Sequence, residues 1–103
     1  MKPSIIVPLH NEEENVEEVV SKLLAVLRRL EDYEVVLVDD CSSDATGKLI
    51  DEWSRKSSKV KAIHRRGSPG FGRALKEGFR AASGDVLIPF MGDLSDNPLD
   101  LSL

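Results

Sequence analysis

Two adjacent acidic residues at the end of an apolar segment are the most informative feature of the sequence. Residues 35–38 are all Val or Leu, and Asp39 and Asp40 follow directly. A short apolar run of this kind is typical of a buried parallel strand, and ligands of open α/β sheets bind outside the carboxyl ends of such strands. The two carboxylates are therefore candidates for binding a ligand. The alternative is that they cap the next helix, which fits Asp39 better than Asp40, although residues 42–44 (Ser, Ser, Asp) already supply capping side chains.

A glycine-rich segment, residues 67–74, lies between a predicted strand and a predicted helix, where backbone N–H groups can bind phosphate. It nearly matches the Walker A pattern G-x-x-x-x-G-K-[ST]. However, Arg73 stands in place of the lysine, and Ala74 lacks the hydroxyl that would bind magnesium. Leu75 occupies the third glycine position of G-x-G-x-x-G, so the segment is not a dinucleotide fingerprint either.

The glycines of this segment allow two interpretations. Gly67 fits a turn that needs a positive φ. Gly70 and Gly72 fit a close approach of the backbone to a ligand or to a strand.

A second acidic group follows the last predicted strand. Asp93 comes after Gly92, and Ser95 and Asp96 lie close to it in the sequence. Mg²⁺ typically takes one or two protein carboxylates and completes its shell with water and phosphate oxygens, so this cluster could hold a metal bound to a diphosphate. The alternative is an Asx turn or a helix cap. We favour the metal for Asp93 and the cap for Asp96.

The elements that must position these residues follow from hydrophobic periodicity. Apolar residues recur at helical spacing from Val16 to Leu30, and Asn11 followed three residues later by Glu14 is the spacing of a helix start. The sequence predicts strands at 4–7 (ended by Pro8), 34–38, 60–63 and 86–90, and further helices at about 44–55, which buries Leu49, Ile50 and Trp53, and at about 71–82. Strands alternating with helices imply right-handed crossovers and a mostly parallel sheet in a three-layer α/β/α architecture.

All four predicted strands end in polar or special residues: 8–12, 39–40, 64–66 and 92–93. Because strands of a parallel sheet share one direction, these ends converge on one crevice. Together they predict a ligand site at the carboxyl edge of the sheet.

The composition restricts the class of protein. The chain has 103 residues and a net charge of −4, which argues against nucleic-acid binding as the main activity. Cys41 is the single cysteine, so no intrachain disulfide can form, and His10 and His64 have no partner at zinc-ligand spacing. No apolar run approaches the roughly 18 residues of a membrane span, and we expect a cytoplasmic location. The local basic residues are Lys61, His64, Arg65, Arg66 and Arg73.

With these residues in place, the sequence resembles the family 2 glycosyltransferases of the GT-A fold, and within them the dolichol-phosphate mannosyltransferase and undecaprenyl-phosphate sugar transferase group. The matching segments, in family order, are residues 6–12, 38–44, 70–74, 81–85 and 91–98. The resemblance implies the strand order 3-2-1-4. It also implies that residues 1–103 are the N-terminal nucleotide-sugar-binding part of a truncated GT-A domain, which agrees with residues 99–103 reading as the start of a helix.

The resemblance also implies roles for individual residues. Pro8, His10 and Glu12 would line the base and ribose pocket, although the family usually has an aromatic residue at the position of His10. Asp40 would hydrogen-bond the base edge, with Val38 beside it. The remaining nucleotide-sugar contacts would come from Gly70, Gly72, Gly92 and Asp93.

The same resemblance implies a metal site. Asp93 would be the catalytic residue and would hold Mg²⁺ or Mn²⁺ together with Ser95. The family's Asp-x-Asp motif reads Met91-Gly92-Asp93 here, so the first carboxylate is absent. A metal at this position would act as a Lewis acid on the leaving diphosphate.

The activity implied is the inverting transfer of a hexose from a GDP- or UDP-hexose to a polyprenyl phosphate. That acceptor is already anionic near neutral pH and needs no general base. We expect the full-length protein at the cytosolic face of a membrane. The fragment alone is expected to be inactive. It is also expected to be marginally stable or to self-associate, because the apolar run 86–90 would adjoin a missing acceptor half.

Two other classes compete with this interpretation. The first is a non-catalytic nucleotide-binding module. The second is a phosphoacceptor receiver domain, which needs acids after the first strand and a single acid after the third. This chain has Pro-Leu-His at 8–10 and His-Arg-Arg at 64–66 instead, so the receiver domain is disfavoured.

Overall fold

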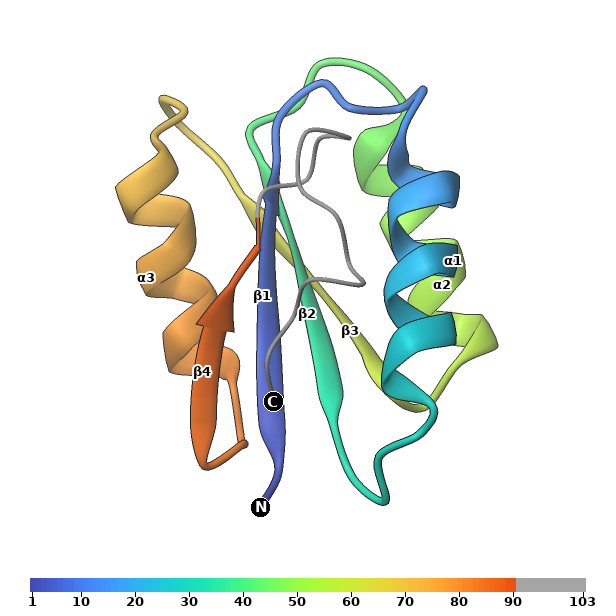
Figure 1. Ribbon diagram of the computed structural model, residues 1–103. Helices are drawn as coiled ribbons and strands as arrows, with labels where there is room; N and C mark the ends of the chain where they lie inside the picture. Colours follow the sequence, from blue (N-terminus) through green and yellow to red (C-terminus); the bar gives the residue numbers. More distant parts are fainter. Residues whose placement is uncertain (91–103) are drawn as a thin grey trace.

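The structure, a computed structural model, describes residues 1–90 of the chain. Strands and helices alternate along these residues, as the periodicity predicts (Figure 1). The elements are β1 (Pro3–Leu9), α1 (Val16–Leu27), β2 (Glu34–Asp40), α2 (Thr46–Lys56), β3 (Val60–Arg65), α3 (Phe71–Ala81) and β4 (Val86–Pro89). The sheet has the order β3-β2-β1-β4 with every neighbouring pair parallel. The predicted fold class and strand order are therefore confirmed.

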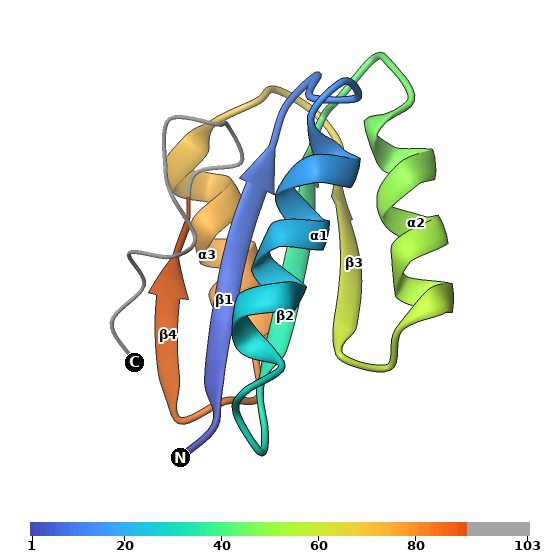
Figure 2. The ribbon, with the colours of Figure 1, turned by 45° about the vertical axis from the view of Figure 1, so that its right-hand side comes forward.

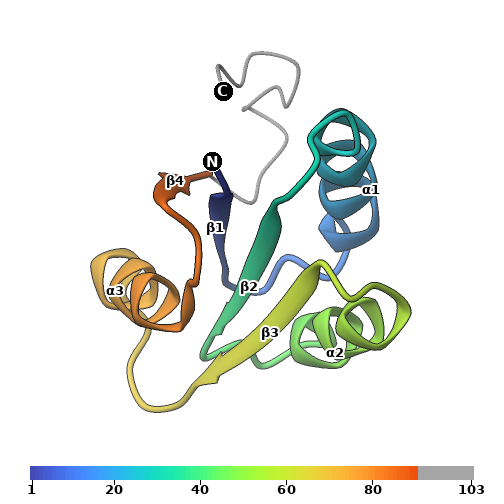
Figure 3. The same ribbon diagram turned by 90° about the horizontal axis from the view of Figure 1, so that it is seen from below.

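The helices cover both faces of the sheet. Helices α1 and α2 lie side by side on one face and α3 lies on the other (Figures 2 and 3). The larger core joins the buried face of α1 to alternate residues of β1 and β2, including Ile5, Val7 and Leu37. The smaller core lies under α3 and contains Ile6, Val36, Val38 and Ala74. Strand β2 is buried along its whole length, as expected for a central parallel strand.

Strand β1 continues through Pro8, where the sequence analysis ended it. The reason is the direction of the backbone groups. The carbonyl of Ile6 accepts a hydrogen bond from the N–H of Phe90, so even-numbered residues of β1 direct their backbone groups toward β4. Strand β4 ends at Pro89, which pairs with Ile6. No carbonyl group of β4 therefore lies opposite Pro8, and the N–H group that proline lacks is not needed there.

The expected start of α1 at Asn11 is wrong. Helix α1 begins at Val16, and the N–H groups of Asn15 and Val16 donate to the carbonyl of Glu12 over 2.9 and 3.1 Å. Asn11 has φ +50°, and its side-chain oxygen accepts a hydrogen bond of 2.8 Å from the N–H of Ser43. Asn11 therefore joins the β1–α1 loop to the β2–α2 loop.

Helix α2 starts two residues later than predicted, at Thr46. Asp44 accepts hydrogen bonds from the N–H and the hydroxyl of Thr46, at 2.9 and 2.6 Å, so one of the proposed capping residues bonds the first helical residue. The hydrogen bonds of Asp44 lower the pKa of its carboxyl against the opposing effect of burial. Of the predicted core residues, Ile50 is fully buried, whereas Leu49 and Trp53 are partly buried against the larger core.

A buried carboxylate at the amino edge of the sheet connects three strands with the α3–β4 loop. Glu34 begins β2 and accepts hydrogen bonds from the Ser4 hydroxyl of β1 and from the N–H of Ser83, while Lys61 of β3 pairs with it at 3.0 Å. Burial by itself raises the pKa of Glu34. The hydrogen bonds from Ser4 and Ser83 and the contact with Lys61 outweigh burial and lower the pKa from 4.5 to about 2.

Strand β4 forms one edge of the described sheet. Val86 and Leu87 are 37% and 41% exposed, whereas Phe90 just beyond the strand is buried. An apolar edge open to solvent is the feature on which the expected self-association rests, and that expectation remains a prediction. Within residues 1–90, no helix has the length and apolar character to cross a membrane.

Candidate functional site

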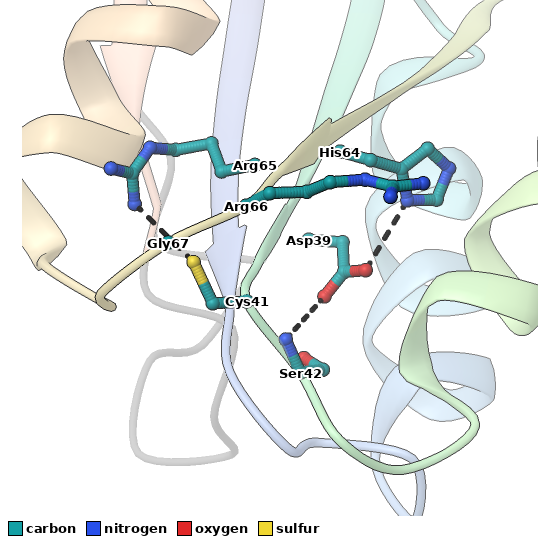
Figure 4. Close-up of a pocket in the computed structure, with 7 residues that line it drawn as sticks. All are labelled: Asp39, Cys41, Ser42, His64, Arg65, Arg66 and Gly67. Atoms are coloured by element: carbon teal, nitrogen blue, oxygen red, sulfur yellow. Dashed lines mark hydrogen bonds and ion pairs between the residues drawn. The ribbon is translucent and has the colours of Figure 1, made fainter.

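A pocket of about 420 Å³ lies at the carboxyl ends of β2 and β3 (Figure 4). Its lining residues are Asp39, Cys41, Ser42, His64, Arg65, Arg66 and Gly67. The strand register explains the grouping, because Asp39 is paired with His64 and Asp40 with Arg65. The predicted convergence of strand ends is therefore confirmed for β2 and β3, and the β1–α1 loop joins the same edge through the hydrogen bond of His10 to the carbonyl of Asp40.

Asp39 contacts the loop behind it and the strand beside it. One carboxylate oxygen accepts a hydrogen bond of 3.0 Å from the N–H of Ser42, and the other lies 3.2 Å from Nδ1 of His64. Both contacts are visible in Figure 4. Ser42 precedes α2, so Asp39 orders the β2–α2 loop and does not cap the helix itself.

His64 contacts carboxylates on two sides. Its Nε2 lies 2.8 Å from a carboxylate oxygen of Asp51 in α2, opposite the contact with Asp39. The hydrogen bond to Asp51 is the main cause that raises the pKa of His64 above 6.5. Burial opposes it, and the contact with Asp39 adds to it. The imidazole is therefore biased toward its protonated form.

Asp40 is 4% exposed and connects β2 to the two elements that follow. One of its oxygens pairs with the guanidinium of Arg65, and the other accepts a hydrogen bond of 2.9 Å from the N–H of Gly70. Its carbonyl oxygen lies 2.7 Å from Nδ1 of His10. The carboxylate predicted to contact the base edge therefore also anchors the loop between β3 and α3.

The other residues predicted on the β1 side do not line this pocket. Pro8 is half-buried and pairs with Val38, whose side chain is fully buried in the core under α3. Glu12 accepts a hydrogen bond of 2.8 Å from the amide of Asn15, and its N–H donates to the Thr46 hydroxyl at 2.9 Å. A nucleotide role for Pro8, His10, Glu12 and Val38 remains a prediction.

The glycine loop agrees with the sequence analysis at one position. Gly67 has φ +107°, which confirms the predicted turn. A Cβ placed at Gly72 would meet nothing within 4 Å, and one at Gly70 would meet only the side chain of Arg73 at 3.5 Å. Among residues 1–90, neither glycine is therefore required by a lack of space for a side chain. The backbone of Gly70 does approach strand β2, through its N–H group and Asp40, and the approach to a ligand remains a prediction for both glycines.

The predicted metal site falls on residues that the structure does not describe. Gly92, Asp93 and Ser95 all lie outside residues 1–90. Within the described residues, no group of three His, Cys, Asp or Glu side chains could hold a metal ion.

Part of the pocket lining was not predicted residue by residue. His64, Arg65 and Arg66 were expected at the converging strand ends but without an individual binding role, and Cys41 was not expected to line the site. Three consecutive basic side chains at the end of a strand next to an acidic strand end were the available signal, because parallel pairing brings such ends together.

Comparison with known proteins identifies the family of the chain. The family model described as Glycosyl transferase family 2 matches residues 4–102. The chain is 43% identical over 98 residues to a dolichol-phosphate mannosyltransferase of Pyrococcus furiosus, covering 95% of this chain and 27% of that protein. It is 33% identical over 102 residues to an undecaprenyl-phosphate 4-deoxy-4-formamido-L-arabinose transferase of Proteus mirabilis, covering 97% of this chain and 31% of that protein.

Two solved structures extend the comparison. A mannosyltransferase from Pyrobaculum calidifontis in complex with GDP-Man and Mn²⁺ superposes with a TM-score of 0.78 at 26% identity, covering 88% of this chain and 27% of that one. The second is glucosyl-3-phosphoglycerate synthase from Mycobacterium tuberculosis in complex with Mn²⁺, UDP and glucosyl-3-phosphoglycerate. It superposes with a TM-score of 0.67 at 25% identity, covering 95% of this chain and 36% of that one. The chain thus spans about a third or less of the proteins it matches. It belongs to glycosyl transferase family 2.

Proposed function

We propose that this chain is the nucleotide-sugar-binding part of an inverting glycosyltransferase, one that moves a hexose from a GDP- or UDP-hexose to a polyprenyl phosphate. The observation that supports it most is the pocket at the carboxyl ends of β2 and β3, in a chain of family 2. The names of the relatives from Pyrococcus furiosus and Proteus mirabilis support the polyprenyl-phosphate acceptor.

The charges of the pocket suit a nucleoside diphosphate. Arg66 is exposed in the pocket wall and forms no ion pair with another of residues 1–90, so its guanidinium is available for a phosphate oxygen. Asp39 places a carboxylate oxygen in the pocket wall, where it can accept a hydrogen bond from an N–H group of a guanine or uracil edge. Asp40 lies at the same strand end but does not line the pocket, so its contact with the base edge rests on the family resemblance. Arg65 is already paired with Asp40 and contributes position more than free charge.

The transfer itself is a displacement at the anomeric carbon. An oxygen of the acceptor phosphate forms the new bond from the face opposite the leaving group, and the nucleoside diphosphate departs with the bonding electrons. The acceptor oxygen is already anionic near neutral pH, so the protein's main tasks are to align the two substrates and to stabilise the departing charge. Arg66 and His64 line the pocket and can stabilise a phosphate group bound in it.

A divalent cation and a membrane belong to the same proposal. Mn²⁺ accompanies the nucleotide in the two solved structures described above. In this chain Asp93, with Ser95, is the candidate to hold Mg²⁺ or Mn²⁺, which would supply Lewis-acid stabilisation of the diphosphate. A lipid-linked acceptor would place the full-length protein at the cytosolic face of a membrane.

Nucleotide binding tests the proposal first. Calorimetry of the natural-length protein with GDP and with UDP should detect binding of at least one of them. Asp40→Ala should weaken that binding by about 1.5–3 kcal/mol, the usual cost of losing a charge-assisted hydrogen bond. Asp32→Ala is a matched control, because Asp32 pairs with Lys59 in an exposed position, at the start of β2 and β3, away from the pocket. Circular dichroism must show that both variants remain folded, since Asp40 also anchors Gly70.

Sugar transfer separates the proposal from its main rival. Labelled GDP-mannose and UDP-glucose, each incubated with dolichyl or undecaprenyl phosphate, should give a labelled lipid. Nucleotide binding without any transfer by the natural-length protein would favour a non-catalytic nucleotide-binding module. Unchanged affinity in Asp40→Ala would remove Asp40 from the nucleotide site.

A further inference from the structure

Three elements meet at the side chain of His64. Asp39 approaches its Nδ1 from β2 at 3.2 Å, and Asp51 approaches its Nε2 from α2 at 2.8 Å. His64 lies near the end of β3 and lines the pocket, with its side chain 38% exposed (Figure 4). Asp51 is not among the residues that line the pocket. A histidine in the pocket wall is thus linked to an acidic residue outside it.

The backbone of α2 makes this arrangement possible. A Cβ placed at Gly47 would lie 2.6 Å from a carboxylate oxygen of Asp39 and 3.4 Å from Cε1 and Nδ1 of His64. Any larger residue at position 47 would therefore displace the carboxylate or the ring. The absence of a side chain there allows α2 to pack directly against the Asp39–His64 pair.

The two contacts of His64 depend on its protonation state. A neutral imidazole has one N–H group and can donate to only one of the two carboxylates, whereas an imidazolium donates to both. Loss of the proton therefore leaves either Asp39 or Asp51 without its donor. The charged groups around the ring are Asp39 from β2, Asp51 from α2, and Arg65 and Arg66 from the end of β3, with Arg65 already paired to Asp40.

We propose that His64 is a positioning residue of the nucleotide pocket. In its protonated form it bridges Asp39 and Asp51 and so holds the Asp39 carboxylate in the pocket wall. The protonated ring also adds a positive charge beside that carboxylate. A nucleoside diphosphate would then bind more tightly to the protonated form than to the neutral form. This inference rests on the proposed nucleotide site and adds a pH dependence to it.

The sign follows from the charges. Protonation of His64 adds a positive charge to a wall that faces an anionic ligand, so affinity is highest at low pH and falls as the pH rises through the pKa of His64. The pKa of His64 lies above 6.5, chiefly because of Asp51, so the fall occurs on the alkaline side of that value. By reciprocity of linkage, a bound nucleotide must raise the pKa of His64 by about one pH unit for each tenfold gain in affinity.

The test varies a residue that does not line the pocket. Calorimetry with GDP-mannose and UDP-glucose, whose phosphates do not change charge in this range, should show roughly a tenfold loss of affinity between pH 5.5 and pH 8.5 in the unchanged protein. Asp51→Asn should shift the midpoint of that loss to lower pH and leave the affinity at pH 5.5 nearly unchanged. His64→Gln should bind with an affinity that depends little on pH. Glu52→Gln is the matched control, because it removes the negative charge next to Asp51 on α2. Glu52 forms no ion pair within residues 1–90, whereas Asp51 pairs with His64.

Magnetic resonance gives a readout that does not depend on turnover. The chain has two histidines, so both ring titrations can be followed in histidine-labelled protein. The midpoint for His64 should fall in Asp51→Asn and rise when nucleotide binds, whereas Asp51→Asn should leave His10 unchanged. Nucleotide binding with no pH dependence, or with the same midpoint in Asp51→Asn, would overturn the role of His64 and leave the proposed function intact. Absence of GDP and UDP binding at every pH would instead overturn the proposed function and this inference with it.

Discussion

The stability of the fold should depend on pH through one carboxylate, Glu34. It is 4% exposed and accepts hydrogen bonds from Ser4 and Ser83, and Lys61 pairs with it. Glu34→Gln keeps the size of the side chain but removes the charge that these donors surround. The substitution should therefore destabilise the folded protein near neutral pH.

The lowered pKa of Glu34 sets the size of the effect. Its folded value of about 2 lies about 2.5 units below the ordinary 4.5, and each unit corresponds to about 1.4 kcal/mol. Because the folded pKa is the lower one, the stabilisation is fully present above pH 4.5 and is lost as the pH falls toward 2. Ionised Glu34 thus contributes roughly 3 kcal/mol at pH 7, a large share of the total stability of a small domain.

Urea unfolding of the natural-length protein and of Glu34→Gln, followed by circular dichroism from pH 7 to pH 3, measures this contribution. The difference in free energy of unfolding should be roughly 3 kcal/mol at pH 7 and should shrink below pH 4.5. Glu77→Gln is the control, because Glu77 forms an exposed pair with Arg80 on α3 and should cost about 0.5 kcal/mol or less. A difference between the protein and Glu34→Gln that stays constant with pH would refute the assignment.

Two further predictions concern α3 and the metal. Gly78→Ala should destabilise the protein by about 1–3 kcal/mol, because the new Cβ would overlap Cγ2 of the fully buried Ile6. Gly72 lies in the same helix, but a Cβ there would meet open space. Gly72→Ala should therefore be neutral or stabilising by up to about 1 kcal/mol. Urea unfolding distinguishes the two variants, and equal effects would contradict the packing argument. Mn²⁺ should strengthen nucleotide diphosphate binding, and Asp93→Asn should remove most of that gain in calorimetry. Equal affinities of the unchanged protein with Mn²⁺ and with a chelator would dismiss the metal assignment.

The arrangement of the fold could be predicted because each element shows its own periodicity. The buried strand at residues 35–38 appears where expected, and the helix predicted from the spacing of Val16 to Leu30 is present but ends at Leu27. The element ends were less predictable, because they depend on neighbours. Pro8 continues β1 since β4 has already ended beside it, and Asn11 bonds the N–H of Ser43, a residue 32 positions away, rather than its own helix.

The site was predictable to the level of strand ends but not of partners. Asp39 and Asp40 lie at the expected edge, since a parallel sheet aligns its carboxyl ends. The pairing of Asp40 with Arg65 depends on the register of β2 and β3. The fit of Asp39 and His64 around Gly47 depends on how α2 packs against the sheet. Neither follows from local sequence patterns.

The position of β1 between β2 and β4 has a consequence for how the chain folds. Contacts between β1 and β2 join residues about 30 apart, such as Ser4 and Glu34, whereas Lys2 and Asp85, which connect the start of β1 to β4, are 83 apart. Bringing the more distant pair together costs more chain entropy. On a ribosome, the unit of β1, β2 and β3 with α1 and α2 can therefore form before β4 is available to pair with it. The last described strand then completes the sheet against the first.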